Sequence, residues 1–162
     1  MTGNVRQLQE RLNYSFKDES VLMLALYHRS CGSGNNERLE FLGDAILCLS
    51  VTDILYRKFP KAREGELSRM RSQIVRAESL AGVAKQLELG SELQLGPGEM
   101  KSGGHRRDSI LGDTVEALIG AVYVDTGLAA AQSCIALWFE ELLAAASEAD
   151  SIRDAKTSLQ EW

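Results

Sequence analysis

The chain has 162 residues, of which 44% are hydrophobic and 25% are charged, a composition typical of one globular domain with its own core. No run of 18 or more apolar residues occurs, and residues 1–16 lack the apolar segment of a signal peptide. The net charge of −5, from 23 acidic and 18 basic residues, is unusual for a nucleic-acid binder but does not exclude one, because six of the acids are candidates for a single site and the other acids are balanced by the basic residues. We therefore expect a cytoplasmic protein with no membrane partner, and the three widely spaced cysteines predict reduced thiols.

Helical periodicity dominates the sequence, and only two prolines interrupt it. The pattern predicts helices over residues 4–13, 18–28, 36–58, 64–76, 77–88, 108–125 and 128–146. The long third helix should stop before Pro60. Residues 31–35 and 89–107 are predicted loops, and the second contains five glycines and a proline. The sequence thus predicts an all-α domain over residues 1–146.

The residues after 146 differ in composition from this domain. Residues 147–154 are polar and are predicted to form a linker. Residues 155–162 have the pattern of a new amphipathic helix, and no later residues are left for it to pack against. We therefore expect this helix to begin a second domain.

Three acidic residues share one face of the helix predicted at residues 36–58. At about 100° per residue, Glu37, Glu40 and Asp44 fall within an arc of about 60°. The same face continues through Cys48 and Val51, which predicts that it runs into the protein. Like charges gathered in a partly buried place are unfavourable unless protons or cations compensate them.

A second acidic pair, Asp113 and Glu116, lies on the helix predicted at residues 108–125, on the face that also carries Gly120 and Val124. Gly43 and Gly112 each precede an aspartate. A glycine inside a helix costs roughly 1 kcal/mol relative to alanine. Glycines at these places therefore indicate that helices approach each other closely.

If the two helices pack together, four carboxylates converge: Glu40, Asp44, Asp113 and Glu116. Oxygen ligands without cysteine or histidine suit a hard cation such as Mg²⁺, for which Mn²⁺ could substitute. Hydrated Mg²⁺ can supply a nucleophilic water and stabilise the charge that develops on a phosphodiester. The alternative is a pair of solvated acidic faces without a metal ion.

The segment from Glu37 to Asp44 closely resembles the signature segment of the ribonuclease III family. Other segments resemble further motifs of that family, in the same order, over about residues 5–146. They are residues 25–30, 64–71, 95–99 with 101–104, and 113–120. Two departures, Ala45 where the family often has serine and Tyr27 where it often has threonine, touch no expected metal ligand.

The resemblance implies a helical, homodimeric ribonuclease III endonuclease domain that cuts double-stranded RNA with Mg²⁺. It also implies products with 5′-phosphate ends and short 3′ overhangs, and a role in processing ribosomal RNA precursors and other structured transcripts. The metal ligands would be Glu40, Asp44, Asp113 and Glu116. Among these, Asp44 and Glu116 match the positions regarded as most critical to the reaction.

The resemblance gives roles to three more side chains and to the last residues. Glu37 and Glu64 match further acids of the cleft, linked to catalysis through dimer contacts, substrate placement or a second metal. Phe41 matches an aromatic residue that enters a pocket of the other subunit, although a core phenylalanine is the commoner interpretation of such a residue. Residues 154–162 resemble the start of a double-stranded-RNA-binding domain, which would begin at residue 155 after a linker at 147–154.

Several basic residues are candidates for phosphate contacts across the minor groove of an RNA duplex. They are Arg69, Arg71, Lys101, Arg106 and Arg107. Each by itself could equally be a solvated surface residue. The rival to an enzyme is a catalytically silent RNA-binding dimer on the same fold, and the presence of all six acids at the family positions favours the enzyme.

Overall fold

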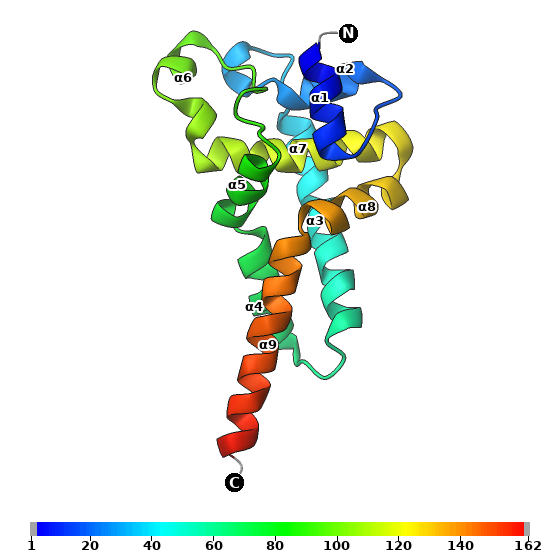
Figure 1. The fold of residues 1–162 in the computed structure, drawn as a ribbon. Coiled ribbons are helices and arrows are strands. Elements are labelled where there is room, and N and C mark those ends of the chain that lie inside the picture. Colours follow the sequence, from blue (N-terminus) through cyan, green and yellow to red (C-terminus); the bar gives the residue numbers. More distant parts are fainter. Residues whose placement is uncertain (1–2, 161–162) are drawn as a thin grey trace.

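Helix α7 (Asp108–Thr126) runs through the centre of the molecule and is buried along most of its length. The computed structural model describes residues 3–160, and within them every regular element is helical. Helix α3 (Glu37–Lys58) crosses α7, and α2 (Glu19–Leu26), α5 (Ala77–Gln86) and α8 (Leu128–Trp138) also pack against it (Figure 1). The predicted all-α fold class is confirmed.

The remaining elements lie around the crossing of α3 and α7 and beside the lower part of α3 (Figure 1). They are α1 (Gly3–Leu12), α4 (Glu64–Val75), α6 (Pro97–Lys101), α9 (Glu140–Gln160) and two 3-10 turns, η1 (Arg29–Cys31) and η2 (Gly104–Arg106). A single strand-like bridge joins Tyr27 to Gln94. This bridge ties the glycine-rich segment before α6 to the turn before α3.

Several helix limits follow directly from local sequence. Asp18 accepts a hydrogen bond from the Ser20 N–H at 3.0 Å and thereby caps α2. Helix α3 ends at Lys58, two residues before Pro60, as predicted. Helix α7 ends at Thr126, and the next residue, Gly127, has a φ of 104°, in the region that favours glycine.

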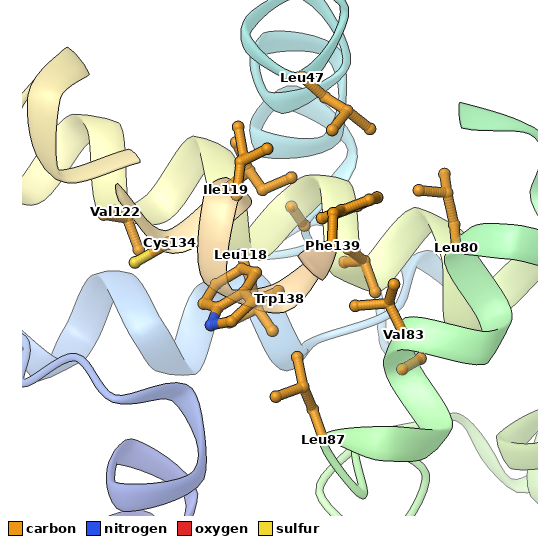
Figure 2. Packing of buried hydrophobic residues seen from close by; sticks show 14 of the residues in the cluster. Leu47, Leu80, Val83, Leu87, Leu118, Ile119, Val122, Cys134, Trp138 and Phe139 are labelled. Carbon is orange, nitrogen blue, oxygen red and sulfur yellow. The ribbon is translucent and has the colours of Figure 1, made fainter. Parts of the chain in front are cut away.

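Large apolar side chains from α5, α7 and α8 interlock in the core (Figure 2). Phe139 and Leu118 are fully buried, and Leu47 brings α3 into the same cluster. Trp138 is also buried, and its Nε1–H donates to the Leu12 carbonyl at 2.9 Å. Because burial of one such side chain contributes roughly 1.5–3 kcal/mol, this cluster holds α7 firmly against its neighbours.

The predicted loop at residues 89–107 contains two short helical elements, α6 and η2. Pro97 occupies the first turn of α6, where its missing N–H is no disadvantage. The Glu99 carboxylate accepts a hydrogen bond from Arg107 at 3.0 Å, which links α6 to the start of α7. This contact between residues eight positions apart was not visible in the periodicity.

The helix predicted at residues 128–146 is interrupted at Phe139, where α8 ends and α9 begins. The chain bends there because both Trp138 and Phe139 enter the core. No single described helix is long and apolar enough to cross a membrane; α8 and α9 together would be, but they are bent by 64° relative to each other.

The predicted linker at residues 147–154 is helical, because α9 continues through it without a break. Arg153 forms ion pairs with Asp150 at 2.8 Å and with Glu66 of α4 at 3.5 Å, which hold this stretch beside α4 (Figure 1). Residues 154–160 are exposed, and residues 161–162 of the predicted amphipathic helix lie outside the described residues. The division into domains stays a prediction.

Candidate active site

Helices α3 and α7 touch through their backbones at two glycines. A Cβ atom at Gly43 would overlap the Glu116 carbonyl and lie 2.9 Å from the Gly120 backbone nitrogen. A Cβ atom at Gly120 would in turn overlap the Leu39 carbonyl. Gly112, the third glycine of the prediction, instead faces α5. The sequence-based expectation of close helix approach is met, and the crossing brings the two acidic segments together.

Five carboxylates from the two helices line one pocket of about 450 Å³ beside this crossing. They are Glu37, Glu40 and Asp44 of α3, and Asp113 and Glu116 of α7. One carboxylate oxygen each from Glu40, Asp113 and Glu116 lies within 4.8 Å of the other two. The side chain of Asp44 interacts with that of Glu116. The four predicted metal ligands therefore converge.

Burial raises the pKa values of three of these carboxyl groups, those of Glu40, Asp113 and Glu116. Glu116 is only 9% exposed. Its burial, followed by its contact with Asp44, raises its pKa to about 9. Burial and the negative charge of Asp113 raise the pKa of Glu40 to about 7. Burial also raises the pKa of Asp113, against the opposing effects of Glu40 and Arg29. The surroundings of the cluster therefore favour the protonated, neutral forms of these carboxyl groups unless a cation compensates their ionised forms.

The donor set fits a divalent cation. Oxygen ligands of Mg²⁺ lie about 2.0–2.1 Å from the ion, so two of them are separated by no more than about 4.2 Å. The spacing of the Glu40, Asp113 and Glu116 oxygens is close to this limit, and small side-chain rotations would meet it. Carboxylates without cysteine favour hard ions over zinc or copper.

The family model described as Ribonuclease-III-like matches residues 18–142, which include both acidic segments. This chain belongs to the ribonuclease III family. Membership confirms the resemblance of the signature segment, and it confirms the prediction of an endoribonuclease.

Individual members of the ribonuclease III family agree with this assignment. The ribonuclease 3 of Proteus mirabilis is 52% identical over 158 residues, which span 98% of this chain and 70% of that relative. The crystal structure of the ribonuclease III nuclease domain from Campylobacter jejuni has a TM-score of 0.83 and 41% identity, and the match covers 86% of this chain and 96% of that one. A second structure of that domain, which describes flexibility in a region involved in dimer formation, has a TM-score of 0.83 and 42% identity over 85% of this chain and 97% of that one.

Two other residues named by the ribonuclease III resemblance lie outside the group of four ligands. Phe41 is 82% exposed at the edge of the pocket, so the alternative of a core phenylalanine is wrong. Glu64 begins α4, accepts a hydrogen bond from Ser68 at 3.0 Å and lines a separate small groove with Arg71. Within one chain Glu64 is not part of the acidic pocket, and its role stays a prediction.

The sequence predicted that the acidic face of α3 runs into the protein, and this prediction is wrong for the part of the face nearest the acids. Asp44 and Cys48 are exposed, and only from Val51 onward is this face buried. On α7, Val124 is likewise exposed, at the far end of the face that carries Glu116. The acids therefore lie at the edge of the core. Helix α3 packs against α7 through Gly43 and Gly120, and the acids lie beside this contact.

None of the five predicted RNA-contacting residues lines the acidic pocket. Arg71 donates to the Thr52 hydroxyl at 3.0 Å, and Arg107 pairs with Glu99. Arg69, Lys101 and Arg106 are exposed elsewhere. The cationic side chain that does line the pocket is Arg29, which sequence reasoning left without a role. Its signal was its place inside the family-like segment at residues 25–30.

Proposed function

We propose that this ribonuclease III family chain hydrolyses phosphodiester bonds of double-stranded RNA with Mg²⁺ bound at Glu40, Asp44, Asp113 and Glu116. The observation that carries the proposal is the convergence of carboxylates from two helices at one glycine crossing. The relatives named ribonuclease 3 support the reaction class. From the resemblance of the motifs alone, we also propose structured transcripts, including ribosomal RNA precursors, as the substrates.

The side chains of the pocket have distinct tasks in this proposal. When bound, Mg²⁺ supplies an activated water and stabilises the charge that develops on the phosphodiester. Glu116 and Glu40 must lose their protons before they can act as ligands, so cation binding releases protons from the pocket. In this proposal the phosphodiester is attacked directly by water, without a covalent enzyme intermediate.

We further propose that two copies of the chain form a homodimer through the exposed face of α3. Phe41, Leu49 and Tyr56 share this face and are 82%, 54% and 73% exposed. Large apolar side chains gathered on one helix face are typical of an interface. Two pockets related by a twofold axis could cut both RNA strands and leave 5′-phosphate ends with short 3′ overhangs. Glu37 and Glu64 would then contribute to substrate placement or dimer contacts.

Cleavage of an end-labelled RNA duplex tests the proposal. We expect cutting with Mg²⁺, none with EDTA, and little cutting of the separated single strands. Glu116→Gln should abolish cutting because a neutral amide is a weaker Mg²⁺ ligand than a carboxylate. Glu148→Gln, at an exposed position of α9, is the matched control and should cut like the parent. If the parent leaves the duplex intact in Mg²⁺ and in Mn²⁺, the proposed function is wrong.

A further inference from the structure

The acidic pocket contains one permanently charged cation, the guanidinium of Arg29. Five carboxylates line the same pocket, and the other lining side chains are His28, Asn36 and Phe41. No lysine and no second arginine contribute to it within the described part of the chain. A phosphate of an RNA strand that enters this pocket therefore meets mainly acidic side chains, and the Arg29 guanidinium is the cationic group there that can attract it.

Arg29 forms no ion pair with any of these carboxylates in the described part of the chain. Among residues 3–160, no acidic side chain lies within 4.0 Å of its guanidinium. Two arginines at or near residues 89–107 do form ion pairs: Arg107 with Glu99 at 3.0 Å, and Arg11 with Glu92 at 3.1 Å. Arg29 is also exposed, so its donors are available to a ligand from solvent.

The backbone that carries Arg29 is held from both sides. The Nδ1 atom of buried His28 lies 2.8 Å from the Ser30 hydroxyl oxygen and accepts the Ser30 N–H at 3.2 Å. The His28 N–H donates to the Gln94 carbonyl at 3.0 Å, and the Gly96 N–H donates to the Ser30 hydroxyl oxygen at 2.8 Å. A fixed backbone on both sides of Arg29 keeps its side chain at the pocket.

We infer that Arg29 binds an oxygen of the phosphate group at which the RNA strand is cut, and so holds that phosphate beside the carboxylates. A guanidinium offers paired N–H donors in one plane, a geometry that matches two oxygens of a phosphate. The inference rests on the proposed function, because it needs an RNA strand in this pocket. It adds a substrate-binding residue to a site whose proposed metal ligands are all acids.

The test compares Arg29→Gln and Arg29→Lys with the parent chain on the same RNA duplex. With enzyme in saturating excess and Mg²⁺ present, Arg29→Gln should cut about 100-fold more slowly, as for other donors that meet transition-state charge. Arg29→Lys should recover part of this loss, because it keeps the charge but not the paired donors. Arg6→Gln, which removes the same charge from exposed α1, is the matched control and should keep the parent rate.

A second measurement, in EDTA and without cutting, follows duplex binding against salt concentration. Loss of one phosphate contact should reduce the slope of log affinity against log salt by about one in Arg29→Gln, and not in Arg6→Gln. A parent chain that cuts while Arg29→Gln cuts equally fast at saturation would overturn the inference and leave the proposed function intact. A reduced salt slope with an unchanged saturating rate would also overturn it, because Arg29 would then contact a different phosphate.

Discussion

The two halves of the molecule are built on different principles. In the upper half α3 and α7 touch through backbone atoms, whereas in the lower half α9 lies beside α4 and holds to it by a few side-chain contacts (Figure 1). Gly43 and Gly120 leave no space for a side chain at the crossing. By contrast, residues 154–160 of α9 are all exposed. The acidic pocket belongs to the tightly packed half.

This difference indicates how the chain tolerates five acids in one place. Repulsion among carboxylates favours separating the two helices that carry them. The contact of Gly43 with the Glu116 backbone, together with buried side chains such as Leu118 and Phe139, resists that separation. A site of this charge could not be placed on α9, where little packing opposes the repulsion.

The largest expected effect comes from filling the crossing. Gly43→Ala places a methyl group where the Glu116 carbonyl lies, and backbone atoms cannot move aside as a flexible side chain can. We expect the free energy of unfolding to fall by about 3 kcal/mol or more, at the upper end of the range for overpacked cores. Urea denaturation measures this change, and Mn²⁺ titration of the folded fraction should show weakened binding.

Gly82→Ala is the matched control for that substitution. Gly82 lies on the exposed side of α5, and a Cβ atom there would meet nothing within 4 Å. Alanine is the better helix former, so stability should rise by roughly 0.5–1 kcal/mol. If both substitutions changed the free energy of unfolding in the same direction, the close crossing would not be what distinguishes the upper half.

The second effect is a pH dependence confined to the upper half. The pKa of Glu116 is raised to about 9 and that of Glu40 to about 7, from ordinary values near 4.5. At a pH between the ordinary value near 4.5 and these raised values, the folded chain keeps protons on Glu40 and Glu116 that the unfolded chain releases. Rising pH therefore favours unfolding. The melting temperature in EDTA should therefore fall as the pH rises from about 5 to about 9.

Adding Mg²⁺ should reverse this trend, because the ion binds the deprotonated carboxylates of the folded chain. The stabilisation by Mg²⁺ should be small at pH 5 and increase toward pH 8. Glu116→Gln removes the most strongly shifted group and should flatten the EDTA profile. A melting temperature in EDTA that rises over this pH range would contradict the raised pKa values.

The features of the upper half were largely predictable from sequence, because they depend on residue types that are costly without a reason. Glycines inside helices, such as Gly43, are unfavourable unless a close contact compensates for them, and clustered acids are unfavourable unless a proton or cation does. Here the glycines mark the crossing of α3 and α7, and the acids mark the pocket beside it. The role of Arg29 was missed because its position depends on Gln94 and Gly96, more than 60 residues away. Long-range contacts of this kind leave no periodic signal.

The lower half was predicted less well for a related reason. The bend at Phe139 has no glycine or proline to mark it, and only the depth of the core there explains it. Residues 147–154 are polar enough for a linker, yet alanine and glutamate in this stretch also favour a helix, and contact of Arg153 with α4 supports it. Composition alone does not decide between these outcomes.

The smallest expected effect tests how weakly the lower half is held. Arg153→Ala removes the ion pairs with Asp150 and Glu66, and the arginine side chain is 35% exposed. Partly exposed pairs contribute up to about 1 kcal/mol, so global unfolding in urea should change little. Hydrogen exchange should instead quicken in residues 150–160 of α9 and remain unchanged in α7, since local opening needs only the local contacts to break. A loss of stability comparable to that of Gly43→Ala, or faster exchange throughout α7, would mean that α9 supports the crossing and that the two halves are one cooperative unit.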